Sequence, residues 1–427
     1  MPPGGSTKRR RGRVTGGAAA EADALISLPP DALDDILTRL GIRDAVRTSA
    51  LSRAWRRRWE ALPSLDLCFR RREDSDGALE RLGVVDGILL RYPGRVRLFD
   101  ADLDGLYAGR IHDWLSILSR RGVEILDLRF SGIFPALPSS VFSCGRLTEL
   151  SLSRCAIPLL PQGFVAFPQL RRLSLNNVRL QENGEYQLEE IIDTSPLLHF
   201  LNLSDVFISG ANARKGVIRA PNLTHLIILS ENNDAWILKE LTSLNYAHIN
   251  LSDLFIHTNF SKFLSGLVQV KKLVIDVPSG YMMPEILLCT FQNLKSLNLF
   301  MNFCKQPAIV LTLCLLKSAP NLEKPKIEVF DEGEQEFEAN GEFLNALWID
   351  GMCANLQVVK MISITWHPNE MSFIELILSK ARLLHTLLIS HSEETVMSNE
   401  DALSELLRYK RASAEAQVLF EGKAEDY

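Results

Sequence analysis

The chain has 427 residues, 46% of them hydrophobic, and a formal net charge of −5. This length gives room for two or three domains, or for one small domain followed by an elongated array. The mild charge argues against nucleic acid or a membrane surface as the main partner, and the longest apolar run, residues 308–316, is too short for a membrane span, which needs about 20 residues.

The seven cysteines favour a reducing compartment. Their number is odd and they contain no C-x-x-C pair, so neither a disulfide framework nor a zinc site is expected. We interpret them as small buried apolar residues. The N-terminus carries no signal-peptide pattern, and we therefore expect the protein in the nucleus, the cytoplasm or both.

Residues 1–23 are predicted to be a disordered tail, because they are low in complexity and poor in large apolar side chains. The tail contains a basic cluster from Lys8 to Arg13. Such clusters can act as nuclear import signals or as nucleic-acid contacts, and a merely solvated tail is an equal alternative.

Residues 24–62 predict three short helices. The prolines of Leu28-Pro29-Pro30 suit a first helical turn, so a helix should begin near Asp31. Its large apolar residues recur with helical spacing and form one stripe: Leu33, Ile36, Leu37 and Leu40. Gly41 should end this helix.

The second helix should be capped by Asp44 and carry Val46. The third should be capped by Ser52 and place Trp55 and Trp59 one turn apart. About thirty residues in three helices cannot bury this much apolar surface among themselves, since chains below roughly 40 residues seldom fold unaided. The segment therefore needs a partner surface.

This segment resembles the F-box. The Leu-Pro entry, the Ile36-Leu37 pair, Leu40, Asp44 and the stretch from Leu51 to Trp59 fall where that motif has them. Gly41 replaces a second Leu-Pro pair, and Leu51 replaces the common valine. The resemblance implies a non-catalytic adaptor role, in which the motif docks on a Skp-type adaptor and, through it, a cullin. The alternative is an ordinary helical cap on the following domain. The residues implied in adaptor binding are Leu28, Pro29, Leu33, Ile36, Leu37, Leu40, Val46, Leu51, Trp55 and Trp59.

Residues 63–350 repeat the pattern L-x-x-L-x-L. Its middle apolar position recurs at intervals of 23–28 residues, apart from one interval of 47 that a weak copy at residues 244–251 divides. The marked positions are Leu126, Leu150, Leu173, Leu201, Leu226, Leu273 and Leu297. This period is typical of leucine-rich repeats, in which each unit supplies one short parallel strand and a returning segment. The irregular repeat lengths resemble those of plant F-box/leucine-rich-repeat proteins.

Residues 351–427 predict a strand near Val358, a helix after Pro368, a strand from Leu384 to Ile389 and a final helix from Asp401. Their order resembles the FBD region of the same plant proteins, although Lys380-Ala381-Arg382 replaces the usual Ala-Pro. Such a region would close the open end of the solenoid. The predicted fold class is thus α/β: a three-helix F-box, then a leucine-rich-repeat solenoid with a curved parallel sheet and helices or irregular segments on its convex side.

No Gly-rich phosphate loop, metal-ligand spacing or nucleophile elbow stands out, so no cofactor is expected and an enzyme hypothesis has no positive support. Recognition should instead use the outward strand residues of the concave face, which mix hydroxyls, amides, aromatics and few charges and so suit a protein target. The alternative target is a small hormone bound above an inositol phosphate. It is disfavoured, because an inositol phosphate site would need more clustered Lys and Arg residues than this face has. The predicted target-binding residues are Glu149, Ser151, Arg172, Ser174, Asn176, Phe200, Asn202, His225, Asn298 and Phe300.

The sequence thus favours the substrate-receptor subunit of a cullin-RING ubiquitin ligase. Two alternatives stay open: an interaction scaffold in which F-box-like helices merely cap the solenoid, and an adaptor-bound protein that engages no target for degradation.

Overall fold

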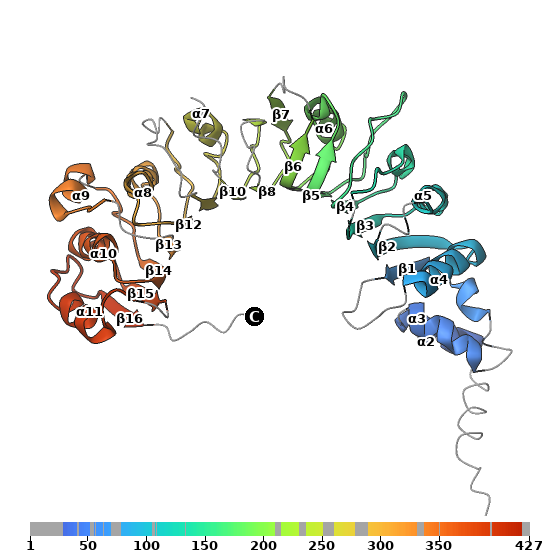
Figure 1. The fold of residues 1–427 in the computed structure, drawn as a ribbon, viewed down its shortest axis with the longest axis horizontal. Coiled ribbons are helices and arrows are strands. Elements are labelled where there is room, and N and C mark those ends of the chain that lie inside the picture. The colour runs from blue at the N-terminus through green and yellow to red at the C-terminus, as the bar shows by residue number, and fades with distance from the viewer. Residues whose placement is uncertain are drawn as a thin grey trace, which may run out of the picture.

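The chain forms a curved solenoid (Figure 1), seen in a computed structural model. The structure describes residues 29–40, 42–51, 55, 57–62, 64–69, 78–104, 107, 109–132, 134–209, 215–229, 236–250, 260–277, 289–330, 337–349, 351–392 and 395–420. Strands line the inner, concave side of the arc and helices lie on its outer, convex side. None of the helices in these ranges has both the length and the apolar character needed to cross a membrane.

The F-box segment lies at the N-terminal end of the arc (Figure 1). Its described elements are α2 (Pro30–Arg39), α3 (Ile42–Arg47) and the 3-10 turns η1 (Thr48–Ala50) and η2 (Arg58–Ala61). The proline at the first position of α2 suits a turn in which its missing N–H has no helical acceptor to lose. The predicted start near Asp31 is confirmed within one residue.

One parallel sheet runs through the described part of the chain and has 14 strands in chain order. They are β1 (Ser64–Phe69), β2 (Arg95–Leu103), β3 (Ile125–Phe130), β4 (Glu149–Ser153), β5 (Arg172–Leu180), β6 (Phe200–Ile208), β8 (His225–Leu229), β10 (Tyr246–Asn250), β11 (Lys272–Asp276), β12 (Ser296–Met301), β13 (Lys324–Val329), β14 (Val358–Ile364), β15 (Thr386–His391) and β16 (Gln417–Phe420). A separate pair joins β7 (Gly216–Arg219) to β9 (Trp236–Lys239).

The predicted repeat register is confirmed strand by strand. Leu126 pairs with Leu150, Leu150 with Leu173, and the series continues through Leu201 and Leu226. Ala247, in the weak copy, then connects Leu226 to Leu273. These residues are at most 4% exposed, whereas the residues on either side of them in each strand are exposed or half-buried, apart from Val274 of β11, which is 4% exposed. The alternation of strand side chains therefore gives one row of core residues along the solenoid.

The convex side carries the returning segments. They include α4 (Ala78–Arg91), α5 (Ile111–Arg120), η4 (Ser139–Ser143), α6 (Gly184–Asp193), α7 (Phe260–Ser265), α8 (Gln306–Ser318), α9 (Gly341–Leu347), α10 (Pro368–Lys380) and α11 (Asn399–Leu406). In α5 the buried residues Ile111, Trp114, Leu115 and Leu118 recur at one helical spacing and pack on the sheet. The apolar run 308–316 falls inside α8, a buried core helix of the repeat.

The C-terminal region continues the same sheet. The predicted strand, helix and strand are confirmed as β14, α10 and β15, and the predicted last helix is α11. β16 then pairs with β15 and forms the end of the sheet in sheet order. The residue boundaries between the predicted domains stay predictions.

Three sequence expectations need correction. Asp44 lies inside the first turn of α3, 3.5 Å from Arg47, and so does not precede the helix as its cap. The third F-box helix is seen only in part: Trp59 lies in the 3-10 helix η2, and the predicted cap Ser52 lies outside the described residues. Cys68 is exposed, because it is an outward residue of the edge strand β1. Cys144, Cys155 and Cys353 are buried as expected, and burial raises the pKa of each thiol to about 12.

Candidate functional site: an F-box platform and a concave sheet

The apolar stripe of α2 divides into two pairs of residues. Leu33 and Leu37 point into the protein and are 5% and 1% exposed. Ile36 and Leu40 are 37% and 38% exposed. Each pair is four residues apart, and the two pairs are separated by about 60° around the helix axis. One side of the stripe thus packs on the chain itself and the other remains open.

The two tryptophans belong to the inward side. Trp55 and Trp59 are 3% and 4% exposed, and the Trp59 ring stacks on Tyr92 with 6.3 Å between ring centroids. The Tyr92 hydroxyl donates a hydrogen bond of 2.8 Å to the carbonyl of Leu62. Arg121 donates to the backbone carbonyls of Tyr92 and Gly94. We call Trp55, Trp59, Tyr92 and Arg121 the seam; it fixes the F-box on the first repeats.

The predicted adaptor-binding set is therefore narrowed. The buried Leu33, Leu37, Trp55 and Trp59 support the platform from beneath and are not available on its surface. Pro29 and Leu51 are exposed, the latter by 59%, and Val46 is partly buried against the core. Leu28 lies outside the described residues. For the exposed residues, adaptor binding stays a prediction.

The ten predicted target-binding residues all lie at outward positions of the concave sheet. Glu149, Arg172, Phe200 and His225 occupy one register row across β4, β5, β6 and β8. The second row contains Ser151, Ser174 and Asn202, and Asn298 lies farther along it on β12. Asn176 and Phe300 belong to the third row. Each of the ten is exposed or half-buried.

Hydrogen bonds order the second row. The Asn202 amide nitrogen donates to the Ser174 hydroxyl over 3.2 Å, and the Ser204 hydroxyl donates to the Asn202 oxygen over 2.7 Å. Farther along, the His248 ring nitrogen lies 3.1 Å from both carboxylate oxygens of Asp276. These side chains are held in place by their neighbours, which favours recognition of a defined shape.

Sequence reasoning missed two residues of the first row. Tyr246 pairs with His225, and Lys272 pairs with Tyr246. The repeat of Tyr246 has Ala247 in place of the usual leucine, and this weakened its signal; Lys272 precedes the regular register mark Leu273. In the other repeats the residue directly before the register mark belongs to this row. The same rule at Ala247 and Leu273 would have identified Tyr246 and Lys272.

An ionic cluster was also missed at the N-terminal part of the concave face. Arg129 contacts the carboxylates of Asp100, Asp102 and Asp127, with 2.6 Å between its Nε and Asp102. Asp100 is only 6% exposed. Burial raises the pKa of Asp127, and the Arg129 guanidinium partly offsets that effect. The cluster links β2 to β3. Because its charged groups contact one another, we interpret it as a stabilising contact between strands and not as an open binding site.

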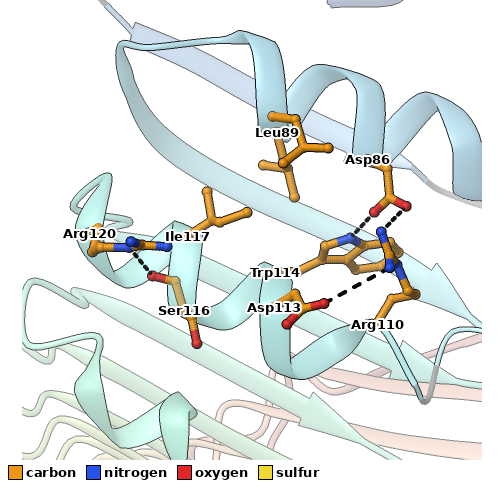
Figure 2. A pocket seen from close by; sticks show the side chains of 9 residues that line it. Asp86, Leu89, Arg110, Asp113, Trp114, Ser116, Ile117 and Arg120 are labelled. Atoms are coloured by element: carbon orange, nitrogen blue, oxygen red, sulfur yellow. Dashed lines mark hydrogen bonds and ion pairs between the residues drawn. The ribbon is translucent and has the colours of Figure 1, made fainter.

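A groove on the convex side lies between α4 and α5 and has a volume of about 240 Å³. Figure 2 shows Asp86 beside both Trp114 and Arg110; the Trp114 indole donates to Asp86 over 2.6 Å. Arg110 also lies 4.0 Å from Asp113. This volume is below the roughly 300–1,000 Å³ of small-molecule sites, and the polar groups in the wall contact one another. Among the described residues, no group of three or more His, Cys, Asp or Glu side chains is placed to hold a metal ion.

Comparisons with known proteins agree with both parts of the molecule. The model of the F-box domain matches residues 25–66, and the family described as "FBD-associated F-box protein At5g56370, LRR repeats" matches residues 111–327. The F-box/FBD/LRR-repeat protein At1g13570 of Arabidopsis thaliana is 30% identical, over 93% of this chain and 98% of its own length. F-box/LRR-repeat protein 13 of the same plant is 24% identical, over 96% and 99%.

Among solved structures, the LRR ectodomain of the Arabidopsis thaliana membrane receptor kinase GASSHO1/SCHENGEN3 matches with a TM-score of 0.29 and 16% identity. The match covers 76% of this chain and 41% of that one. At this score the likeness supports no argument about function.

Proposed function

The chain belongs to the F-box/FBD/LRR-repeat family, and on that premise we propose that it is the target-recognition subunit of an SCF-type cullin-RING ubiquitin ligase. In this proposal the F-box docks on a Skp-type adaptor, which attaches to a cullin, and the concave sheet holds a target protein. The ubiquitin chemistry takes place on other subunits, and the chain raises the effective concentration of the target near them. The protein acts in the nucleus, the cytoplasm or both; the basic cluster Lys8 to Arg13 that bears on this lies outside the described residues.

One observation supports adaptor docking most directly. Ile36, Leu40 and Leu51 expose 37%, 38% and 59% of their surface within a segment that matches the F-box domain. The residues that alternate with them, such as Leu37, are buried in the chain itself. Large aliphatic side chains that are held outward on a rigid base suit burial by a second protein.

The burial of Trp55 and Trp59 favours a second candidate. Because Trp59 stacks on Tyr92 and Trp55 is buried in the same continuous core, the helices also act as a cap of the solenoid. A chain that used them only in this way would be an interaction scaffold outside any ligase. The two candidates differ in what the exposed aliphatic residues do.

Capture of the full chain on an immobilised Skp-type adaptor tests the proposal. Ile36→Asp and Leu51→Asp should each weaken binding at least about tenfold, because a carboxylate would be buried in the interface. Leu407→Asp is the matched control, since Leu407 is 69% exposed next to α11 at the opposite end. Circular dichroism should show all three variants folded. Equal capture of the three variants and the natural chain, or no capture at all, would leave the capping role as the better account.

A cellular measurement separates a ligase subunit from an adaptor-bound protein without a degradation target. Proteins that co-purify with the chain through its solenoid should rise in abundance when the chain is removed. Restoring the natural chain, but not its Leu51→Asp variant, should return them to their initial level. Unchanged abundance of every co-purified protein would contradict degradation as the output.

A further inference from the structure

A continuous ladder of neighbouring side chains crosses the concave sheet from β5 to β11. We call its members the ladder: Arg172, Phe200, His225, Tyr246 and Lys272. Each lies directly before the core residue of its strand, so consecutive members are register neighbours. Side chains stand roughly perpendicular to a sheet, and the ladder therefore faces the hollow of the arc.

The ladder has an aromatic centre and a cation at each end. The Arg172 guanidinium carbon lies 4.2 Å from the centroid of the Phe200 ring. The centroids of Phe200 and His225 are 6.3 Å apart, and those of His225 and Tyr246 are 5.7 Å apart, with interplanar angles of 32° and 34°. The Lys272 ammonium lies 5.7 Å from the Tyr246 centroid. Arg172, His225 and Lys272 are exposed, and the two outer rings are half-buried.

The charge along this edge of the sheet is predominantly positive. Among the described residues at or directly before the start of strands β4, β5 and β11–β13, the cations are Arg171, Arg172, Lys271, Lys272, Lys295 and Lys324, and the carboxylates are Glu149 and Glu323. Glu323 pairs with Lys295 over 2.6 Å, and Glu149 lies 3.7 Å from Arg172. After these two pairs four of the six cations remain in excess along this edge: Arg171, Lys271, Lys272 and Lys324.

The geometry of the rings favours one of two classes of anionic ligand, an acidic peptide or a single-stranded nucleic acid. The end cations lie over the faces of Phe200 and Tyr246, and His225 lies between these two rings at interplanar angles of 32° and 34°. Because ladder neighbours occupy both sides of each ring, we infer that ring edges, rather than free ring faces, meet the hollow. The edge of an aromatic ring carries partial positive charge and attracts carboxylate or carbonyl oxygens. A nucleobase would instead need a free ring face on which to stack. The ladder therefore suits a peptide with acidic side chains better than a single-stranded nucleic acid.

We propose that the ladder binds an extended, acidic segment of the target protein, with carboxylates facing Arg172 and Lys272 and aromatic or proline side chains between them. This inference rests on the proposed function and names the chemistry of its target. Four strand steps separate the two cations, or about 19 Å at roughly 4.8 Å per step, and an extended peptide covers that distance in about six residues. The expected motif is thus a pair of acidic residues about six positions apart.

The test begins with a display library of random peptides of about twelve residues, selected on the purified full chain without an adaptor. Recovered peptides should carry Asp or Glu pairs near the expected spacing, and one of them becomes the labelled probe. The double variant Arg172→Glu/Lys272→Glu should weaken binding of this probe at least about tenfold, because both contacts change from attraction to repulsion. Phe200→Ala and Tyr246→Ala should weaken it several-fold.

Lys360→Glu is the matched control, because Lys360 is an exposed cation of the same concave sheet, on β14 and outside the ladder. It should leave probe binding within about twofold of the natural chain. Recovery of basic or neutral peptides, recovery of none, or an equal loss in Lys360→Glu would overturn the proposal. A labelled oligothymidylate that binds more tightly than the probe, and that the double variant loses, would also overturn it in favour of nucleic acid.

Adaptor capture by the double variant separates this inference from the proposed function. Capture should equal that of the natural chain, since the F-box and the ladder are on different elements. Failure of adaptor capture with intact peptide binding would contradict the ligase proposal alone. Intact capture with no acidic-peptide preference would contradict the ladder proposal alone.

Discussion

Two sets of neighbouring aromatic side chains lie in this molecule, and they differ in how far they are covered. In the seam, Trp59 stacks on Tyr92 and the two are 4% and 1% exposed. In the ladder, His225 is exposed between the half-buried Phe200 and Tyr246. The covered stack of the seam fixes the F-box on the solenoid, whereas the open ladder is accessible to a ligand. The two sets thus differ in solvent exposure more than in the kind of ring, and exposure distinguishes the structural set from the proposed recognition surface.

The largest expected effect comes from breaking the covered stack. Trp59→Ala should remove about 3–5 kcal/mol of packing energy at the F-box end, because it leaves a cavity against Tyr92. Limited proteolysis should then cut within residues 29–62 much faster than in the natural chain, and adaptor capture should fall. Trp59→Phe, which keeps a ring over Tyr92, should lose clearly less. Equal resistance of Trp59→Ala and the natural chain would show that the seam does not hold the F-box.

The same contrast between covered and open groups should appear in charged residues. Glu370 in α10 is 0% exposed, and its carboxylate accepts backbone N–H groups from Thr365 and His367, each over 3.0 Å. Burial disfavours the charged form and raises the pKa of Glu370 to about 7, although the N–H donors partly offset this effect. Because the pKa is higher in the folded chain, the protonated carboxyl stabilises the fold fully below its ordinary value of 4.5, and this stabilisation is lost as pH rises through about 7.

Glu370→Gln should remove this pH dependence. The amide oxygen can accept both N–H groups, and the amide nitrogen can donate to the Thr365 hydroxyl, which now lies 3.3 Å from the carboxylate. Denaturant titrations between pH 5 and 8 should show the natural chain losing up to about 3 kcal/mol relative to this variant as pH rises. Glu375→Gln, at an exposed position of the same helix, is the control and should follow the natural chain. A parallel pH profile for natural chain and Glu370→Gln would contradict the assignment.

A smaller effect is expected at the partly covered ionic cluster. Arg129→Ala should destabilise the fold by about 2 kcal/mol at neutral pH, because it leaves Asp100, Asp102 and Asp127 without their shared cation. The loss should shrink at lower pH, where the carboxylates can take up protons. Arg97→Ala removes a more exposed pair with Asp66 and should cost less than about 1 kcal/mol. Equal costs for the two variants at all pH values would show that coverage is unimportant here.

The smallest effect on stability should come from the open ladder. Phe200→Ala should cost about 0.5–1 kcal/mol, since it removes cross-strand contacts of a half-buried ring. Phe99→Ala is the sharp comparison, because Phe99 is a fully buried ring of β2 and should cost about 3–5 kcal/mol. Denaturant unfolding of both variants measures the difference. A large loss in Phe200→Ala would assign the ladder a structural role.

Most of the fold, but less of the candidate functional site, could be predicted from the sequence. The spacing from Leu126 to Leu297 fixed the strand register, because the alternation of core leucines is a local property of each repeat. The helical spacing of Leu33, Ile36, Leu37 and Leu40 predicted one stripe, but it could not show which side would be covered. That depends on elements distant in sequence, such as Tyr92 at the end of α4. The sequence predicted three members of the ladder as target-binding residues: Arg172, Phe200 and His225. It did not predict Tyr246, because the repeat of that residue departs from the leucine pattern.

The most direct measurement of the central claim is hydrogen exchange, read by mass spectrometry, on the full chain with and without a purified Skp-type adaptor. The two surfaces belong to separate parts of the chain, so adaptor binding should slow amide exchange in α2, α3 and the adjoining residues up to Leu51. Peptides from β4 to β11 should exchange at unchanged rates. Protection of the concave strands by the adaptor, or unchanged exchange in residues 29–51, would contradict an F-box platform that works beside a free recognition sheet.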